Sequence, residues 1–300
     1  MNMTAAGRIM MAQKIDGKEV SLFIKDKIKN ETEKLKNKTG SVPGLAVILV
    51  GNDSASHVYV RNKKLACEYC GFYSESYELP ESTSQQQLLK LIDTLNKNNN
   101  IDGILVQMPL PAHIDADTVI NAILPEKDVD AFNPSNVGRI MLGEYSFLPC
   151  TPAGVMELLK YYNIDVSGKE CVVIGRSNIV GKPMAMLLLH ENATVTVCHS
   201  RTRELADVTR RADILVCAVG RPMFVTADMV KDGAVVIDVG INRKPDGKLC
   251  GDVDFESVEK KASFITPVPG GVGPMTISML MQNTLTSYKL KVKRSQNNGI

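Results

Sequence analysis

The sequence lacks a strong charge of one sign, a long hydrophobic run and an even set of cysteines. Its 300 residues carry a formal net charge of +2, which is too balanced for a protein that binds nucleic acid through phosphate contacts. Apolar runs such as AMLLL and ILVCAV are far too short to cross a bilayer. We therefore expect neither nucleic acid nor membrane among its partners.

The seven cysteines are scattered along the chain, and an odd, scattered set does not indicate a disulfide framework. The first eleven residues, MNMTAAGRIMM, have neither the apolar segment of a signal peptide nor the arginine content of a transit peptide. These features favour a reducing compartment, and we expect a cytoplasmic protein. Cys67 and Cys70 form a lone CxxC, and the histidines lie far apart, so no metal site is expected.

Hydrophobic patterning divides the chain into two alternating series of helices and strands. The first series predicts helices at 18–37, from 54 onward, 85–96 and 116–123, and strands at 45–50, 73–79 and 103–107. After Pro-Cys-Thr-Pro at 149–152, the second predicts helices at 153–162 and 275–290, and strands at 170–174, 194–198, 213–217, 234–238 and 264–266. Such alternation indicates an α/β fold of two domains, the second a Rossmann-like, doubly wound parallel sheet.

The stretch SASHVYVRNKK at 54–64 follows the strand-like run LAVILV, and Asn52, Asp53 and Ser54 supply side chains that cap helices, so a helix is expected to begin here. In a helix, Ser56, Tyr59 and Lys63 fall within an arc of roughly 60°. A single lysine in such a row of residues is typical of a solvated helix face. The alternative is that the three side chains form part of a polar functional site, and the other motifs help to decide between the two.

The segment CVVIGRSNIVGKPMAMLLLH at 171–190 is typical of a strand, a glycine-containing turn and a helix. In a doubly wound sheet this turn is where nucleotide phosphates meet the N-terminus of a helix. Gly175 and Gly181 do not form the standard G-x-G-x-x-G pattern. Taken alone, the turn is equally compatible with a plain strand–helix connection.

The next strand, TVTVC, is followed by His199, Ser200 and Arg201 rather than by an acidic residue. An NAD-preferring site usually has Asp or Glu there, which accepts a hydrogen bond from the ribose 2′-hydroxyl. A hydroxyl and a guanidinium, with Arg176 in the preceding turn, would instead hold a 2′-phosphate. The pattern therefore predicts NADP, unless these are only exposed loop residues.

A third loop, TPVPGGVGPMT at 266–276, combines prolines and glycines but lacks the Gly-Lys-Ser/Thr of a P-loop. Its bare glycine backbone suits close approach to a flat ligand. The loop is also compatible with a tight turn before the last helix.

In the first series, DGILVQMPLP leaves Gln107 at the carboxyl end of a strand, where ligands of parallel α/β sheets gather. The segment PEKDVDAFNP follows, with Asp128 and Asp130 two residues apart. In an extended segment they would point the same way, and Pro134 is expected to keep the segment non-helical. A carboxylate beside a lysine and a glutamine would form a polar cluster.

Six motifs occur in order: YVRNK, DGILVQMPLP, PEKDVDAFNP, PCTPAG, GRSNIVGKP and ITPVPGGVGPMT. Together they resemble the methylenetetrahydrofolate dehydrogenase/cyclohydrolase family, from about residue 14 to 288. The resemblance implies two domains flanking a cleft, in a homodimer. Folate would bind the first, residues 1–150 with the C-terminal helix at 275–300, and NADP the second, residues 151–274.

The resemblance also implies two reactions. Oxidation of 5,10-methylenetetrahydrofolate with NADP would give 5,10-methenyltetrahydrofolate, and hydrolysis would then give 10-formyltetrahydrofolate. A monofunctional NADP-dependent dehydrogenase or a non-catalytic NADP-binding protein on the same fold are the alternatives.

Site residues follow from the same resemblance. It implies catalytic roles for Lys63, Tyr59, Gln107 and Asp130, and substrate contacts for Ser56, Tyr59, Asp130, Pro269, Gly270 and Gly273. It implies NADP contacts for Gly175, Arg176, Ser177, Ser200 and Ile241. Ala131 departs from the family's pattern, in which glycine is usual after that aspartate.

A physical role for Lys63 can be stated beside this resemblance. A fixed ammonium next to the cationic methenyl product would be unfavourable. A lysine with a lowered pKa would instead transfer protons between water and a folate nitrogen. Gln107 would orient the amine without adding charge, and Tyr59 would pack against the folate ring.

Overall fold

The computed structural model describes residues 11–52 and 54–297, with the backbone alone for residues 54–56. The chain forms two compact units. One contains Thr151–Thr276 together with the described N-terminal residues up to Ser21, and the other contains Leu22–Cys150 together with the residues from Ile277 onward. Each unit has a parallel sheet with helices, which confirms the predicted α/β class.

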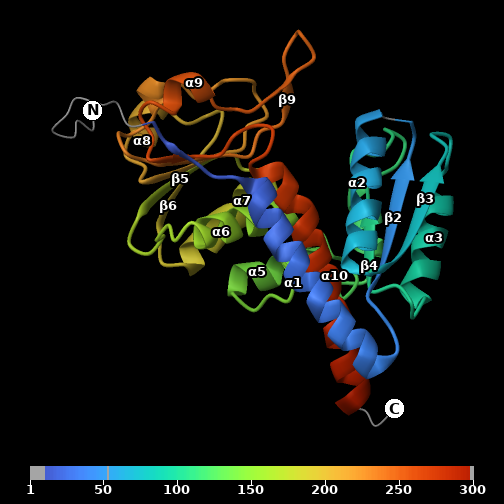
Figure 1. Ribbon diagram of the computed structural model, residues 1–300. Helices are drawn as coiled ribbons and strands as arrows, with labels where there is room; N and C mark the ends of the chain where they lie inside the picture. The colour runs from blue at the N-terminus through green and yellow to red at the C-terminus, as the bar shows by residue number, and fades with distance from the viewer. Residues whose placement is uncertain (1–10, 53, 298–300) are drawn as a thin grey trace. The chain divides into compact units, whose positions relative to one another are not determined.

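The unit around Leu22–Cys150 contains a parallel sheet with the order β3-β2-β4. Its strands are β2 (Gly44–Val50), β3 (Tyr73–Leu79) and β4 (Gly103–Val106). Helices α2 (Ser54–Cys70) and α3 (Gln85–Lys97) flank this sheet (Figure 1), and α4 (Ala116–Ala122) follows β4. Alternate side chains of β2 pack against side chains of α3 in one hydrophobic core, which contains Ala46, Ile48, Val50, Leu88, Ile92 and Leu95.

Strand β2 lies between the two strands that follow it in the chain, with β3 on one side and β4 on the other. The carboxyl ends of β2 and β4 therefore flank a topological switch point, where α/β sheets bind ligands. Helix α2 begins after β2, and Gln107 follows β4 directly.

Two long helices, α1 (Gly17–Thr39) and α10 (Val272–Asn297), run side by side (Figure 1). Within the Leu22–Cys150 unit, Lys289 of α10 forms an ion pair with Glu31 of α1. The hydroxyls of Tyr288 and Thr39 lie 2.6 Å apart. From Ile277 onward, the C-terminal helix thus packs as part of this unit, although it follows the other unit in sequence.

The segment 125–134 is not extended, which corrects the sequence-based expectation. It forms turns at 125–127 and 129–130, on either side of an isolated parallel bridge between Asp128 and Ile104. Pro134 begins a helix, α5 (Pro134–Leu142), which Asn133 caps by accepting a hydrogen bond from the backbone N–H of Ser135. Proline suits the first helical position because its missing N–H is not needed there. The carboxylate of Asp128 points inward and accepts hydrogen bonds from Asn133 N and Asn136 Nδ2, both at 2.8 Å.

The other unit contains a six-stranded sheet with the order β1-β11-β8-β7-β5-β6, parallel throughout. The strands are β1 (Gln13–Lys14), β5 (Glu170–Ile174), β6 (Thr194–Cys198), β7 (Ile214–Cys217), β8 (Val235–Asp238) and β11 (Phe264–Ile265). From β5 onward the order is that of a doubly wound sheet, with its switch point between β5 and β7.

Strand β1 was not expected from the sequence. Gln13 and Lys14 pair with β11, so the described N-terminal residues belong to this unit, whereas the sequence assigned residues 1–150 to the other domain. A two-residue strand has no hydrophobic periodicity to reveal it.

Helices α6 (Cys150–Tyr161) and α7 (Gly181–His190) were expected from the sequence, although α6 begins earlier than predicted. The shorter elements were not. They are α8 (Leu205–Thr209), η1 (Ala227–Met229), α9 (Phe255–Val258) and a hairpin of β9 (Asn242–Arg243) and β10 (Leu249–Cys250).

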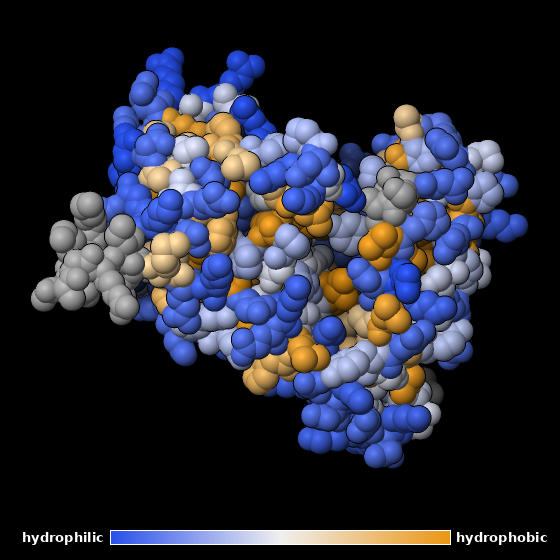
Figure 2. Space-filling model, turned by 45° about the horizontal axis from the view of Figure 1, so that its top comes forward, coloured by the Kyte–Doolittle hydropathy of each residue, from blue (hydrophilic) through white to orange (hydrophobic). Residues whose placement is uncertain are grey.

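In Figure 2 the visible surface is mostly hydrophilic, and hydrophobic residues appear singly or in small groups. This is the usual appearance of a chain whose apolar side chains fill its cores. Among the described residues, no helix has the length and apolar character needed to cross a membrane.

Candidate active site

Lys63 is buried, although Tyr59 on the same helix face is exposed. Only 8% of Lys63 is accessible, whereas 39% of Tyr59 is. The Nζ atom of Lys63 donates a hydrogen bond to Gln107 Oε1 at 2.7 Å, and Gln107 Nε2 donates to Met108 O at 2.8 Å. The Gln107 amide is thereby oriented with its oxygen toward the amine, so Lys63 is not part of a solvated helix face.

Burial lowers the pKa of Lys63, and the Asp130 carboxylate opposes this shift. Burial likewise raises the pKa of Asp130 to about 6, against the attraction of Lys63. The two groups therefore have pKa values shifted toward each other, which suits proton transfer near neutral pH. The structure thus brings Lys63, Gln107 and Asp130 together within one unit.

Two neighbours of Asp130 were not identified as site residues from the sequence. The Cys150 thiol donates to Asp130 Oδ1 at 3.6 Å, and burial raises the pKa of this thiol well above its usual value. Asn283 of α10 donates to Val129 O and Leu148 O, both at 2.8 Å. Cys150 lies in the PCTPAG motif, but nothing in the sequence links Asn283 to residues more than 130 positions away.

Ala131, the departure from the family's pattern, has a φ of 58°. An L-residue in this left-handed region carries a cost of roughly 1–2 kcal/mol that glycine avoids. A glycine would therefore suit the backbone beside Asp130 better. The side chain of Ser56, another predicted substrate contact, lies outside the described residues.

The predicted phosphate turn in the other unit is closely packed. Gly175 has a φ of 128°, and a Cβ atom there would lie 2.2 Å from Ala218 O, in the loop after β7. A Cβ on Gly181 would lie 2.2 Å from Gly175 O. Ser177 Oγ accepts from the backbone N–H groups of Val180 and Gly181 at 3.2 and 3.3 Å. This packing leaves bare backbone at the N-terminus of α7, which suits a phosphate.

The residues predicted to hold a 2′-phosphate lie in exposed positions after β5 and β6. Arg176, Ser200 and Arg201 are all exposed. The turn after β6 is closed by His199, whose Nδ1 accepts from Arg201 N at 3.1 Å. Strands β5 and β6 are neighbours, so these side chains extend from adjacent strand ends at one edge of the sheet.

The loop at 266–276 lies in the same unit as these residues. A Cβ on Gly273 would be 3.6 Å from Ile241 Cδ1, so the two lie side by side, and Ile241 is 47% exposed. Gly270 has a φ of 110°, and the Val268–Pro269 peptide bond is cis. A predicted substrate residue, Gly273, therefore adjoins a predicted cofactor residue, Ile241.

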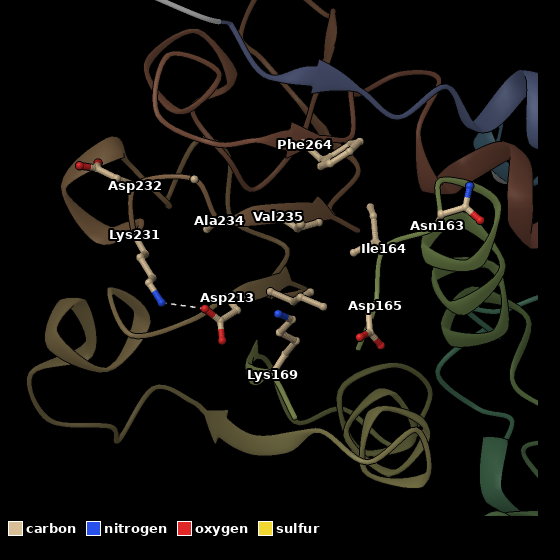
Figure 3. Close-up of a pocket in the computed structure, with 12 residues that line it drawn as sticks. Asn163, Ile164, Asp165, Lys169, Asp213, Lys231, Asp232, Ala234, Val235 and Phe264 are labelled. Atoms are coloured by element: carbon tan, nitrogen blue, oxygen red, sulfur yellow. Dashed lines mark hydrogen bonds and ion pairs between the residues drawn. The ribbon is translucent and has the colours of Figure 1, made fainter. Parts of the chain in front are cut away.

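A cavity of about 320 Å³ opens at the opposite, amino-terminal edge of the six-stranded sheet (Figure 3). Residues that precede strands line it, including Lys169 before β5 and Asp213 before β7. Asp213 is paired with Lys231 at 2.7 Å. Because ligands of parallel sheets bind at the carboxyl edge, we do not assign the cofactor to this cavity.

Two family models match the chain. Residues 15–130 match the catalytic domain of tetrahydrofolate dehydrogenase/cyclohydrolase, and residues 149–292 match the NAD(P)-binding domain of the same family. Together these ranges cover most of the chain.

Similar proteins cover nearly the same length. The bifunctional protein FolD of Agathobacter rectalis is 62% identical over 279 residues, which is 93% of this chain and 100% of that protein. The crystal structure of the bifunctional enzyme FolD, a methylenetetrahydrofolate dehydrogenase/cyclohydrolase from Campylobacter jejuni, is 54% identical with a TM-score of 0.91, covering 93% and 99% of the two chains.

A third similar structure is that of the methylenetetrahydrofolate dehydrogenase-cyclohydrolase (FolD) of Trypanosoma brucei, complexed with NADP cofactor and inhibitor. It is 43% identical with a TM-score of 0.91, covering 94% of this chain and 99% of that one. With both domain models matched and relatives of this identity over nearly its whole length, the chain belongs to the tetrahydrofolate dehydrogenase/cyclohydrolase family.

Proposed function

We propose that this chain oxidises 5,10-methylenetetrahydrofolate to 5,10-methenyltetrahydrofolate with NADP and hydrolyses the product to 10-formyltetrahydrofolate. The observation that carries the proposal is the buried amine of Lys63, which donates to Gln107 Oε1 at 2.7 Å beside the Asp130 carboxylate. Family membership supplies the substrate class. The experiment is to mix purified protein with methylenetetrahydrofolate and NADP, and to follow NADPH and methenyl-folate by absorbance.

Lys63 is the proton carrier of the hydrolytic step in this proposal. Water adds to the cationic methenyl carbon and gives up one proton to the amine. The bond from that carbon to one folate nitrogen then breaks as the nitrogen takes a proton, and the remaining hydroxyl proton passes to solvent as the formyl C=O forms. Burial lowers the pKa of Lys63, which favours the neutral amine that accepts the first proton. The resulting ammonium is stabilised by Asp130 and then donates to the nitrogen.

We assign the cofactor to the carboxyl edge of the six-stranded sheet. The glycine turn at Gly175 and Gly181, where side chains would collide with backbone, fits the close approach of a dinucleotide phosphate. Arg176 and Ser200 would hold the 2′-phosphate, Ser177 would order the turn, and Ile241 would contact the cofactor. NADP supplies the hydride acceptor when bound, and the protein's part in that step is mainly alignment.

Replacing Arg176 with Ala is expected to weaken NADP binding about tenfold or more, because a charge-assisted contact is lost. NAD has no 2′-phosphate, so its affinity should change little. Fluorescence titration with both reduced cofactors measures the two changes. Equal losses for NADP and NAD would contradict the assignment of Arg176 to the 2′-phosphate.

Asp130 is proposed to accept hydrogen bonds from the pterin, with Tyr59 and Ser56 as further folate contacts and Pro269, Gly270 and Gly273 approaching the flat ligand. Asp130→Asn should raise the KM for folate at least several-fold and leave the KM for NADP nearly unchanged.

The same variant should also change the pH profile of hydrolysis. The Asp130 carboxylate raises the pKa of Lys63, so its removal lowers that pKa further. The acid limb of the profile should therefore move to lower pH. A rise in the KM for NADP with unchanged folate kinetics would contradict the placement of Asp130.

A monofunctional dehydrogenase is the second candidate, and the buried Lys63–Gln107 pair argues against it because hydride transfer needs no proton carrier. Hydrolysis of methenyltetrahydrofolate added without cofactor separates the two candidates. A non-catalytic NADP-binding protein would show neither reaction.

We further propose a homodimer in the cytoplasm. All seven cysteines are free and buried, as expected in a reducing compartment, and the dimer is proposed on family membership alone. Light scattering of the purified protein would test the dimer, and the mass of a monomer would contradict it.

A further inference from the structure

The carboxylate of Asp252 is fully buried and bonded only to neutral N–H donors in the contacts that the structure describes. Oδ2 accepts from the backbone of Val219 at 2.7 Å and of Gly220 at 3.0 Å. Oδ1 accepts from Arg221 N and from Asn242 Nδ2, both at 2.9 Å. Asp252 is 0% exposed. One side chain thus joins the loop after β7 to the segment after β8.

A second buried carboxylate, Asp238 at the end of β8, holds Asp252 in place. Asp238 Oδ1 accepts from the backbone N–H groups of Asp252 and Gly240, both at 2.9 Å. Oδ2 accepts from Val253 N at 2.9 Å. The backbone approaches closely here, because a Cβ on Gly240 would lie 2.3 Å from Asp252 Cγ and a Cβ on Gly251 would lie 1.8 Å from Asp238 Oδ2.

The loops that Asp252 joins are those expected to border the cofactor. The loop after β7 begins with Ala218, whose carbonyl lies against Gly175 of the phosphate turn. Asn242 directly follows Ile241, a proposed cofactor contact. The first segment follows the carboxyl end of β7, which flanks the switch point between β5 and β7, and the second follows the carboxyl end of β8, the neighbour of β7.

We propose that Asp252 is a positioning residue for the cofactor, which sets the loop at residues 218–221 and the Ile241–Asn242 segment in the geometry that NADP requires. This inference rests on the proposed function, because it takes NADP as the ligand of this unit. Asp252 itself is enclosed by backbone and Asn242, and acts through the residues that it holds.

An amide cannot replace this carboxylate, although it has nearly the same shape. Each oxygen of Asp252 accepts two N–H donors, so the NH₂ group of an asparagine would face one pair of donors in either orientation. Asp252→Asn therefore loses two hydrogen bonds and places donor against donor. The loops lose their common anchor, while the residues proposed for hydrolysis belong to the other unit.

The test compares Asp252→Asn with Asp246→Asn in full-length protein. Asp246 is an exposed carboxylate in the turn between β9 and β10, so Asp246→Asn makes the same chemical change at an exposed position nearby. NADPH affinity is measured by fluorescence titration, and hydrolysis of added methenyltetrahydrofolate is measured without cofactor. Asp252→Asn should weaken NADPH binding about tenfold or more, with hydrolysis within about twofold of wild type. Asp246→Asn should change neither.

Unchanged NADPH affinity in folded Asp252→Asn would overturn the proposal, as would a parallel loss of both activities that follows the fraction of unfolded protein. If Asp252→Asn does not fold, Asn242→Ala removes a single one of the four bonds. A several-fold weaker NADPH affinity there, with unchanged hydrolysis, supports the proposal, and unchanged affinity overturns it. Failure of the proposed function itself is recognised separately, because wild-type protein would then neither bind NADPH nor hydrolyse the methenyl substrate.

Discussion

Lys63→Met is expected to abolish the hydrolysis of methenyltetrahydrofolate. The amine of Lys63 is buried, oriented by Gln107 at 2.7 Å and adjacent to the Asp130 carboxylate, and methionine retains the volume without a transferable proton. General acid–base catalysis contributes about 10²–10⁴ to a rate, so the residual rate should fall below about 1% of wild type. Dehydrogenation should fall less, because hydride transfer depends mainly on alignment. Methenyl-folate decay and NADPH formation are followed separately.

Two further variants show whether hydrolysis depends on proton transfer by Lys63 or only on its positive charge. Lys64 is exposed on the same helix, and Lys64→Met should leave both rates within about twofold of wild type. Lys63→Arg keeps a positive charge that cannot be deprotonated, so hydrolysis should still be lost. If hydrolysis survives in Lys63→Met, or is lost in Lys64→Met, Lys63 is not the proton carrier and has only a structural role.

Gly181→Ala should greatly weaken NADP binding, although alanine is the better helix former. Gly181 is the first residue of α7, and its Cβ would lie 2.2 Å from Gly175 O and 2.7 Å from Arg176 N. Both are rigid backbone atoms, so the turn and the helix must separate. Overpacking costs about 1–3 kcal/mol or more, and displacement of the phosphate turn should raise the Kd for NADPH by about 100-fold. Fluorescence titration measures this, and unaltered affinity would contradict the placement of the cofactor.

Gly138→Ala is the matched control for Gly181→Ala. Gly138 lies within α5, and a Cβ there would meet nothing within 4 Å. The change should stabilise the protein by about 0.5–1 kcal/mol through helix propensity. Thermal unfolding should show a raised Tm for Gly138→Ala with unaltered kinetics, against a lowered Tm for Gly181→Ala.

The long elements were predictable because their hydrophobic patterns extend over several turns or strand residues. Strand β3, for example, spans Tyr73–Leu79 as the pattern indicated. Helix α5 was missed, because Pro134 was interpreted only through its effect on the residue before it. That effect holds, since Asn133 is non-helical, but proline also suits the first position of a helix. Strand β1 is too short to have a pattern.

The candidate site was predictable only in part, for a physical reason. Helical phase placed Tyr59 and Lys63 on one face, but phase does not reveal that Lys63 is buried and Tyr59 is not. Spacing placed Asp128 and Asp130 together, whereas hydrogen bonds from Asn133 and Asn136, which cap and begin the following helix, turn Asp128 inward and hold it there. Asn283 and Asp252 act through contacts with distant segments, which a local pattern cannot show.

The measurement that most directly tests the proposed bifunctional activity is a two-product assay with wild-type protein. Methylenetetrahydrofolate and NADP are added, and NADPH, methenyltetrahydrofolate and 10-formyltetrahydrofolate are quantified over time. We expect one NADPH for each folate oxidised, and enzyme-dependent conversion of the methenyl product to 10-formyltetrahydrofolate at a rate that Lys63→Met removes. Accumulation of methenyltetrahydrofolate that decays no faster than in buffer, or a failure to form NADPH, would contradict the assigned function.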